Sequence, residues 1–309
     1  MRVLNQLPSE PSNREIALTV GTFDGVHRGH AFLIEKLKQE AAQRGLQTAV
    51  LTFTDMPYCY FRPDECSRLL TLPDEKVRAF EPLQLDELLM VPFDKQIAEQ
   101  PADEFVARVL VEKLRLKLLV AGPDFALGKG RAGDVTALRT LGKQHGFEVV
   151  VLDEKLNDEG AISSTRIREC VEDGHMKTAA RLLGRTFALQ GNVVSGQQLG
   201  RTIGVPTINL QVHARKVLPA NGVYVARAFF DDSPAPHRCA LNIGTRPTVN
   251  GQSLSVEFHV IGENIETPPQ IAQLEIVERL RDEKKFPDLN TLVEQMQRDI
   301  ARAADILSA

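Results

Sequence analysis

Two histidines, three residues apart, follow an apolar segment and precede an amphipathic one early in the chain. His27 and His30 lie in "GTFDGVHRGH" (21–30), between "IALTV" (16–20) and a run from Ala31 with apolar residues at helical spacing. The amino terminus of a helix attracts phosphate through its unpaired N–H groups and its dipole. Imidazoles near neutral pH donate hydrogen bonds to charge that develops on a phosphate. The stretch therefore predicts phosphoryl or nucleotidyl transfer without the lysine of a P-loop.

A hydroxyl-rich stretch, "ISSTRIRE" (162–169), is a second candidate for phosphate binding. Serine and threonine favour the start of a helix, so a plain helix cap is the alternative interpretation. The two interpretations are compatible, because a cap and a phosphate use the same N–H groups. An arbitrary HxGH is more often made of ordinary turn residues. The flanking strand, the glycines and this second motif together favour a site.

The second half of the chain contains another pattern that suits phosphate. In "GQQLGRTIGVPTINL" (196–210), a glycine-rich loop precedes a strand-like segment. Backbone N–H groups of such a loop can wrap phosphates, although the glycines alone favour a plain hairpin loop. The hydroxyl of Thr207 and the amide oxygen of Asn209 are hard oxygen donors that suit Mg²⁺. Further on, Glu257 in "VEFH" (256–259) fits either a general base or a surface strand residue.

Strand-like and helix-like segments alternate through the first half, which must position the histidines. The strand candidates are "IALTV" (16–20), "QTAVLTF" (47–53), "DELLMVPF" (86–93), "LKLLVAG" (116–122) and "FEVVVL" (147–152). Several of them are apolar throughout, which is typical of a parallel sheet covered on both faces. Such sheets bind ligands beyond the carboxyl ends of their strands. The histidine motif follows one of these ends, so we expect a Rossmann-like α/β domain over residues 1–184.

The pattern changes after about residue 184. Short β-rich segments are then separated by Gly, Pro and Asn, which is typical of an antiparallel barrel or sandwich. We expect a small antiparallel β-barrel over residues 185–309, closed by a helix at about 289–307. The apolar residues of that helix are Leu292, Met296, Ile300 and Ala304.

Composition narrows the class of protein further. The 309 residues carry a net charge of −4, which argues against a nucleic-acid partner. No apolar run reaches membrane length, and the first residues lack the apolar core of a signal peptide, so we expect a cytoplasmic protein without membrane contact. The four cysteines form no CxxC pair, so we expect four free thiols.

The first half resembles the FMN adenylyltransferase module of bacterial FAD synthetases. "GTFDGVHRGH", "GPDFALGKGRAGD" (122–134) and "ISSTRIRE" match that family's motifs in its order. The resemblance implies that His27 and His30 stabilise the α-phosphate of ATP while FMN attacks it, and that Arg166 neutralises the departing pyrophosphate. It also implies a set of nucleotide-binding residues: Gly21, Phe23, Asp24, Gly29, Asp124, Ser163, Ser164 and Thr165.

The second half resembles riboflavin kinase. The glycine-rich loop with "PTIN", "LNIGTRPTV" (241–249), "VEFH" and "RLRDEKKFPDLNTLVEQMQRDI" (279–300) match that family in order. The resemblance implies Glu257 as general base for the riboflavin 5′-hydroxyl and Thr207 and Asn209 as Mg²⁺ ligands. The implied nucleotide-binding residues are Gly196, Gly200, Arg201, Thr202 and Gly204. The implied flavin-binding residues, some of which also suit the start and packing of the last helix, are Asn242, Arg281, Glu283 and Phe286.

Together the two resemblances predict a bifunctional enzyme that uses ATP and Mg²⁺ to convert riboflavin to FMN and FMN to FAD. The alternatives are an enzyme in which only the kinase works, or a flavin-binding regulatory protein with decayed catalysis. Three departures from the family pattern bear on activity: "TDMPYCYF" (54–61) replaces a Pro-His-Pro segment, Leu127 replaces an aromatic residue, and 261–276 replaces an Asp-Leu-Tyr-Gly segment. Small molecules are the expected partners, and transient self-association is left open.

Overall fold

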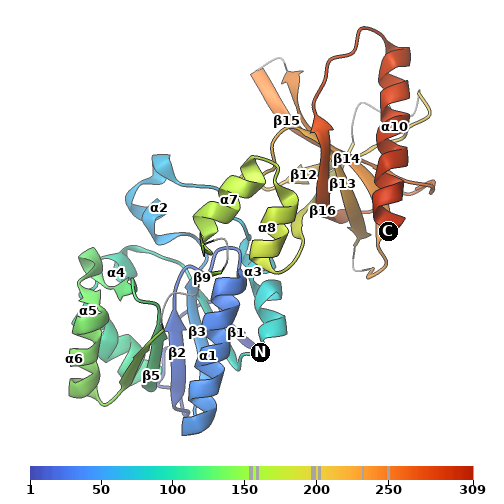
Figure 1. Ribbon diagram of the computed structural model, residues 1–309. Coiled ribbons are helices and arrows are strands. Elements are labelled where there is room, and N and C mark those ends of the chain that lie inside the picture. The colour runs from blue at the N-terminus through green and yellow to red at the C-terminus, as the bar shows by residue number, and fades with distance from the viewer. Residues whose placement is uncertain are drawn as a thin grey trace. The chain divides into compact units, whose positions relative to one another are not determined.

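The computed structural model describes residues 1–152, 156–157, 160–195, 200, 203–231, 233–248 and 251–308. The chain divides into two units, Met1–Ser164 and Thr165–Ala309 (Figure 1). Each unit is described by itself.

A six-stranded sheet forms the centre of the first unit, with the strand order β1-β4-β3-β2-β5-β8. All five strand pairs are parallel. The chain proceeds from β2 to one side through β3 and β4, and returns to the other side of β2 as β5, so the strand order reverses at the carboxyl end of β2. The strands are β1 (Arg2–Leu4), β2 (Ile16–Val20), β3 (Gln47–Phe53), β4 (Glu87–Val91), β5 (Leu116–Ala121) and β8 (Glu148–Val151).

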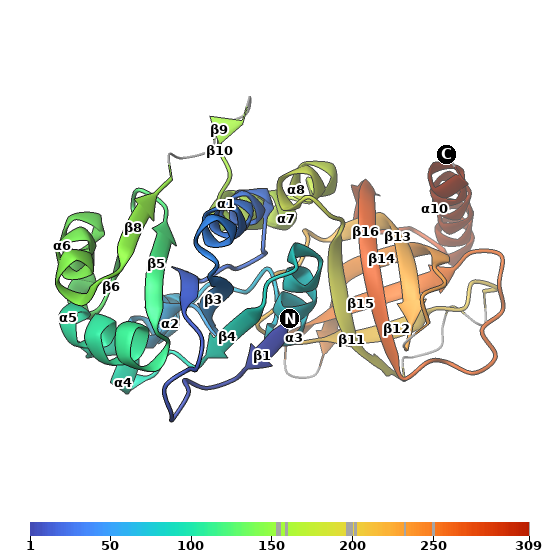
Figure 2. The same ribbon diagram turned by 90° about the horizontal axis from the view of Figure 1, so that it is seen from below.

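Helices cover both faces of this sheet, as the apolar strands predict (Figure 2). The longer ones are α1 (Arg28–Arg44), α3 (Pro73–Phe80), the π-helix η3 (Phe105–Lys113) and α6 (Val135–His145). The short helices are α2 (Pro57–Phe61), η1 (Pro63–Glu65), η2 (Glu81–Leu83), α4 (Lys95–Ala98), α5 (Ala102–Glu104) and η4 (Lys129–Arg131). Short strand pairs are made by β6 (Ala126–Leu127) with β7 (Gly133–Asp134) and β9 (Leu156–Asn157) with β10 (Gly160–Ala161).

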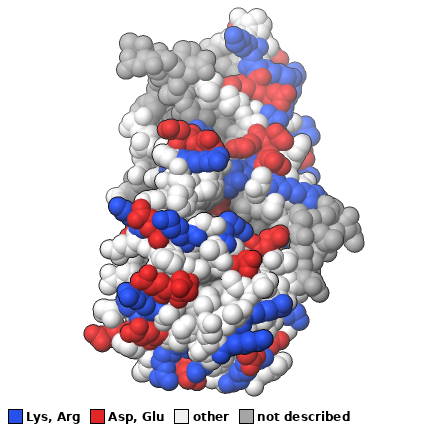
Figure 3. Space-filling model, turned by 90° about the vertical axis from the view of Figure 1, so that its left-hand side faces the viewer, with Lys and Arg blue, Asp and Glu red and all other residues white. Residues whose placement is uncertain are grey.

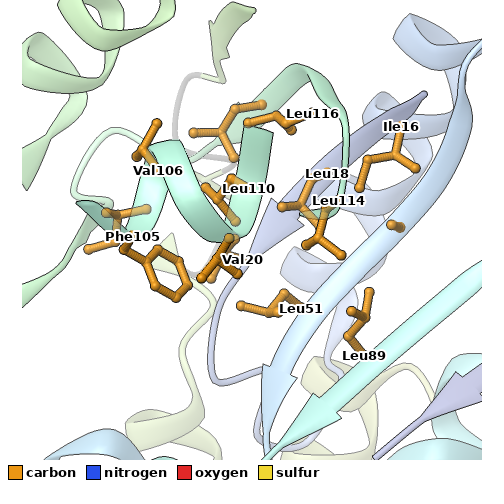
Figure 4. Close-up of a cluster of buried hydrophobic side chains, with 14 of the residues drawn as sticks. Ile16, Leu18, Val20, Leu51, Leu89, Phe105, Val106, Leu110, Leu114 and Leu116 are labelled. Atoms are coloured by element: carbon orange, nitrogen blue, oxygen red, sulfur yellow. The ribbon is translucent and has the colours of Figure 1, made fainter. Parts of the chain in front are cut away.

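Alternate residues of β2 enter two separate cores. Ile16, Leu18 and Val20 pack with η3 on one face, whereas Ala17 packs with α1 on the other. Figure 4 shows the first core, in which the side chains of η3 lie over those of β2, β3, β4 and β5. The labelled residues are Ile16, Leu18, Val20, Leu51, Leu89, Phe105, Val106, Leu110, Leu114 and Leu116. Burial on both faces fixes the strand, and with it the turn that follows Val20.

The second unit is a closed antiparallel barrel, which confirms the barrel rather than the sandwich. The strand order is β11-β12-β15-β14-β13-β16. Helix α10 (Leu289–Ser308) follows the last strand and buries Ala303 against Val223 and Leu280. The strands are β11 (Phe187–Val194), β12 (Ile208–Val212), β13 (Gly222–Phe230), β14 (His237–Thr248), β15 (Gly251–Val260) and β16 (Ile271–Asp282).

Two helices precede the barrel, α7 (Ser164–Glu172) and α8 (Met176–Leu183). The Nζ atom of Lys177 lies 2.7 Å from a carboxylate oxygen of Glu278 on β16, and a Cβ at Gly174 would contact Arg279. The division between the two units therefore falls at Ser164, twenty residues before the expected end of the first domain. The functional division at residue 184, just after α8, stays a prediction.

Two findings concern the cysteines and the surface. The expectation of four free thiols is wrong: Cys59 and Cys66 form a disulfide, with their Cα atoms 4.8 Å apart, while Cys170 and Cys239 are free. A separation of seven residues did not show that α2 and η1 fold back on each other.

Among the described residues, no helix is both long and apolar enough to cross a membrane. Basic and acidic side chains alternate over the face drawn in Figure 3.

Two candidate active sites

The turn after β2 carries the two histidines in an unusual backbone conformation. Phe23, Gly25 and Val26 have positive φ angles of 47°, 83° and 40°. Such angles are ordinary for glycine, but each costs another residue about 1–3 kcal/mol and persists only where surrounding contacts enforce it. Phe23 is buried and its ring packs edge-on against Phe80 of α3. The turn is therefore held by the interior of the unit.

His27 and His30 cap helix α1 reciprocally. The backbone N–H of His30 donates to Nδ1 of His27, and the backbone N–H of His27 donates to Nδ1 of His30, both at 3.3 Å. The rings stack with their centroids 3.6 Å apart. Because each Nδ1 accepts a hydrogen bond, a neutral ring carries its proton on Nε2, which fixes both tautomers. The predicted pair is thus brought together as two oriented Nε2–H donors.

Packing explains the two glycines of this motif that were predicted to bind nucleotide. A Cβ at Gly29 would lie 3.1 Å from the ring of His27, and a Cβ at Gly21 would lie 3.0 Å from the ring of Phe23. Either methyl group would displace a ring that shapes the turn. Gly21 and Gly29 therefore keep the motif compact, whatever they contact in a complex.

Asp24 has a place that the sequence did not suggest. Its side chain is only 1% exposed, and its carboxylate accepts hydrogen bonds from the backbone N–H groups of Leu70 and Thr71, both at 3.0 Å. Its carbonyl oxygen accepts from the hydroxyl of Ser164 at 2.8 Å. Asp24 thus ties the histidine turn to the segment before α3 and to the hydroxyl-rich stretch. Nucleotide contact by Asp24 and Phe23 stays a prediction, and the contacts described give both residues a positioning role.

Lys76 of α3 is a residue that the sequence reasoning missed. It is 2% exposed, and its ammonium group donates to the carbonyls of Thr22, just after β2, at 3.0 Å and of Phe53, the last residue of β3, at 2.8 Å. Burial lowers the pKa of Lys76 from 10.5 to about 8, and the carboxylates of Asp24 and Asp55 oppose that shift. Its spacing of four residues from the buried Phe80 was the available signal, because it places Lys76 on the inner face of α3.

A cavity of about 750 Å³ opens beside the same strand ends, and we call it the aromatic cavity. Asp124 lies at its edge, and the guanidinium of Arg131 donates to the carbonyl of Asp124 at 2.8 Å. Tyr58 and Phe61 come from the segment in which the family's Pro-His-Pro is missing. The aromatic lining residues are Phe53, Tyr58, Phe61, Phe93, Phe105 and Phe125. A planar aromatic ligand suits such walls.

The hydroxyl-rich stretch starts helix α7 at Ser164, next to an exposed Ser163. Ser164 reaches the histidine turn through its bond to Asp24, and Ile162 contributes a carbonyl 3.6 Å from where a Cβ of Gly29 would stand. Thr165 and Arg166 belong to the second unit. Their action on phosphate therefore stays a prediction.

In the barrel, strand pairing brings the predicted kinase residues together. Asn209 of β12 lies directly opposite Glu257 of β15. The hydroxyl of Thr207 donates to Glu257 Oε2 at 3.4 Å, and the hydroxyl of Ser255 donates to Glu257 Oε1 at 2.7 Å. Both carboxylate oxygens are thus fixed by hydroxyl groups. Ser255 was missed, although its position two residues before Glu257 places it on the same face of the strand.

A cavity of about 470 Å³, here the barrel cavity, has Glu257 in its wall. Arg281 is held there by Asp299 of α10, with Nη2 and Nε 2.7 and 2.9 Å from Oδ2, and it lies 5.8 Å from the ring of Phe286. Gln295 donates to the same carboxylate at 2.9 Å. All four residues predicted to bind flavin line this cavity: Asn242, Arg281, Glu283 and Phe286. Asp299 was missed because its partner lies 18 residues away.

A second cavity of the barrel, about 600 Å³, includes Ser195, Thr207 and Asn209, and we call it the adjoining cavity. Thr207 lines both cavities, and its hydroxyl donates to Glu257 in the wall of the first. In the glycine-rich loop, Gly204 has a positive φ of 78°, and a Cβ at Gly200 would lie 3.3 Å from the Thr207 hydroxyl. The predicted residues Gly196, Arg201 and Thr202 lie outside the described residues.

These features define two classes of domain: a nucleotidyltransferase-type α/β domain with its histidine turn at the switch point of the sheet, and a flavokinase-type barrel. Comparison with known proteins agrees. The family model for FAD synthetase matches residues 9–166, and the family model for riboflavin kinase matches residues 183–307. The chain belongs to the bifunctional riboflavin kinase/FMN adenylyltransferase family.

Individual relatives cover nearly the whole chain. The bifunctional riboflavin kinase/FMN adenylyltransferase of Escherichia coli K12 is 37% identical over 96% of this chain and 93% of its own. The protein of the same name from Haemophilus influenzae is 36% identical over 93% of this chain and 92% of its own length. A solved structure described as a macrolide-efflux protein from Streptococcus pneumoniae is 29% identical, with a TM-score of 0.87 and coverage of 97% of each chain.

Proposed function

We propose that the chain catalyses both reactions named by its family. Riboflavin and ATP give FMN and ADP in the barrel, and FMN and ATP give FAD and pyrophosphate in the α/β unit. The observation that carries the proposal is that Thr207, which donates a hydrogen bond to Glu257, lines two cavities. A flavin-sized cavity and a second cavity that share a wall residue bonded to a carboxylate suit the transfer of a phosphoryl group from one ligand to another.

In the kinase reaction, Glu257 takes the proton of the riboflavin 5′-hydroxyl while that oxygen attacks the γ-phosphorus of ATP. The bond to the β-phosphate oxygen breaks, and ADP leaves. Ser255 and Thr207 orient the carboxylate, so less conformational entropy is lost when the reactive geometry forms. The hydroxyl of Thr207 and the amide of Asn209, beside a carboxylate, are hard oxygen donors that fit Mg²⁺, and the ion would neutralise charge on the ATP phosphates.

We assign the flavin of this reaction to the barrel cavity and ATP to the adjoining cavity. Phe286, whose side chain lies beside the Arg281 guanidinium, offers an aromatic face to the ring system. Asn242 and Glu283 offer polar groups at the same wall. Gly204 borders open space, whereas a Cβ at Gly200 would clash with the carbonyl of Val205, so glycine at position 200 lets the loop pack closely beside Thr207.

In the adenylyl transfer, a phosphate oxygen of FMN attacks the α-phosphorus of ATP and the bond to the β-phosphate oxygen breaks. His27 and His30 donate from Nε2 to the oxygens on which charge develops, helped by the amino terminus of α1. Ser163 holds the departing pyrophosphate, and the roles of Thr165 and Arg166 stay predictions. The flavin ring occupies the aromatic cavity, which begins at Gly21 and Thr22 of the same turn.

A product time course tests this proposal. Purified protein is incubated with riboflavin, ATP and Mg²⁺, and the three flavins are separated by chromatography. We expect FMN to rise first and FAD to follow. FMN without FAD, even when FMN is supplied, would support the alternative of a working kinase alone, and no conversion at all would support a flavin-binding protein. Mg²⁺ dependence, a cytoplasmic location and transient self-association stay predictions.

A further inference from the structure

The disulfide lies in a segment that forms one wall of the aromatic cavity. The segment 57–67 contains α2, η1 and both Cys59 and Cys66. It contributes Pro57, Tyr58 and Phe61 to the cavity lining. The disulfide joins the end of the segment that follows β3 to the end that leads to α3.

The aromatic side chains of this wall are substantially exposed. Tyr58, Tyr60 and Phe61 are 38%, 41% and 61% exposed. The hydroxyl of Tyr58 accepts a hydrogen bond from the backbone N–H of Ser67 at 2.6 Å, and the Phe61 ring lies 6.1 Å from that of Phe93. Segments whose apolar side chains are largely exposed open at low free energy. The disulfide is the covalent link that restrains this wall.

We propose that Cys59 and Cys66 are a reversible thiol–disulfide modification site, and that their oxidation state sets the affinity of the α/β unit for FMN. The inference rests on the proposed function, in which the aromatic cavity binds the flavin ring. The reactant is a small dithiol or a protein dithiol. Its thiolate attacks one sulfur of the pair, the Cys59–Cys66 bond breaks, and its second thiol resolves the mixed disulfide. Two electrons and two protons pass to the cysteines, and the reductant leaves as a disulfide.

The expected direction follows from loop entropy. The disulfide closes a short ring that contains Tyr60 and Phe61, and its reduction increases the number of conformations open to the wall. FMN must then order these residues when it binds, which weakens binding. The histidine turn is held by other groups, namely Asp24 and Lys76, so the chemical step itself is spared.

The experiment uses the full chain in oxidised form and after treatment with dithiothreitol. A zinc-selective chelator is present throughout, because the side chains of Asp55, Cys59 and Cys66 bring ligand atoms within 4.8 Å of one another and the reduced pair can capture a soft metal ion. Thiols are counted after denaturation. We expect two thiols before reduction, from Cys170 and Cys239, and four after it.

On reduction we expect the KM for FMN in FAD formation to rise about tenfold while kcat stays within about twofold, because reduction removes pre-organisation rather than a catalytic group. The KM for riboflavin in FMN formation, measured on the same samples, should not change. A Cys59→Ser/Cys66→Ser variant should behave like reduced protein under both conditions. A Cys170→Ser variant should respond to reduction as the parent chain does.

Three results would overturn the inference. Four thiols before reduction would mean that the pair does not form, and an equal KM for FMN in both states would mean that it does not act on binding. A Phe125→Ala variant separates this failure from that of the proposed function, since Phe125 lines the aromatic cavity but lies outside the segment 57–67. If Phe125→Ala leaves the KM for FMN unchanged, the assignment of the flavin to the aromatic cavity fails, and this inference fails with it. If Phe125→Ala raises that KM but reduction of the parent chain does not, only this inference is overturned.

Discussion

The histidine turn and the Glu257 site hold their reactive groups by different means. In the barrel, Glu257 and Asn209 face each other because of strand register, and Ser255 joins them because it lies on the same face of one strand. In the α/β unit, the turn runs through positive φ angles and is held by hydrogen bonds from Leu70 and Thr71 to its own Asp24 and from Lys76 to its Thr22 carbonyl. A site built on strands is fixed by the fold itself, whereas a strained turn needs buried polar contacts to keep its shape.

The sharpest test of this comparison removes the base of the barrel site. Glu257→Gln should lower the rate of FMN formation by about 10²–10⁴-fold, because the amide cannot accept the hydroxyl proton. FAD formation from supplied FMN should stay at the parental rate. The rates of FMN formation and of FAD formation are both measured by chromatography of the flavins. The matched control is Glu278→Gln, a carboxylate on β16 that pairs with Lys177. An unchanged rate of FMN formation would remove Glu257 from the mechanism.

The corresponding change in the α/β unit is His30→Ala. It should lower FAD formation by about 10²–10³-fold, the usual loss for one donor to developing charge. FMN formation should continue, so FMN accumulates in the time course. His145→Ala, at the exposed end of α6, is the control. Loss of both activities to the same extent would point to general unfolding and contradict two separate sites.

The strained turn should also be sensitive to pH through Lys76. Its pKa is about 8 in the folded chain and 10.5 when exposed, so between these values the unfolded chain binds more protons. The contribution of Lys76 to the free energy of unfolding is therefore lowest below pH 8. It rises by up to about 3 kcal/mol as the pH approaches 10.5. Replacement by a neutral side chain, Lys76→Met, removes this dependence but leaves two strand-end carbonyls without their donor.

Hydrogen exchange of the α/β unit in the parent chain and in Lys76→Met, measured at pH 7.5 and pH 10, checks this expectation. The difference in stability between the two proteins should shift in favour of the parent chain at the higher pH. FAD formation by Lys76→Met should fall while FMN formation holds. A stability difference that does not change with pH would show that Lys76 titrates as an exposed lysine.

The smallest effect concerns the flavin wall of the barrel. Asp299→Ala removes the carboxylate that orients Arg281 and should raise the KM for riboflavin about tenfold, the loss expected for one charge-assisted hydrogen bond of about 1.5 kcal/mol. The value of kcat should change less, because Asp299 does not touch the reacting atoms. Asp305→Asn, exposed on the same helix, is the control. Equal losses in KM and kcat would place Asp299 in the chemical step instead.

The sequence predicted the elements closely where periodicity is strong. "IALTV" became β2 with the expected bounds, and the last helix runs over Leu289–Ser308 against an expected 289–307. Apolar strands buried on both faces and an amphipathic helix leave a signal in neighbouring residues. The barrel residues predicted from the family motifs lie together in the structure, because strand register places Asn209 opposite Glu257.

Contacts between distant segments left no such signal. The Cys59–Cys66 link depends on the fold-back of α2 and η1, and the aromatic cavity draws its rings from Phe53 to Phe125 across several loops. The segment that lacks the family's Pro-His-Pro instead supplies Tyr58 and Phe61 to the cavity wall.

The sequence by itself determined the two domain classes and the order of their elements, and its motifs singled out His27, His30 and Glu257 as candidate reactive residues, since each of these rests on a local pattern. Tertiary structure decided how those residues are held. Lys76 reaches two strand ends, and Asp299 reaches Arg281, only because helices pack in one particular arrangement. Hydrogen bonds between side chains far apart in the chain are set by that packing, and no spacing along the sequence encodes them.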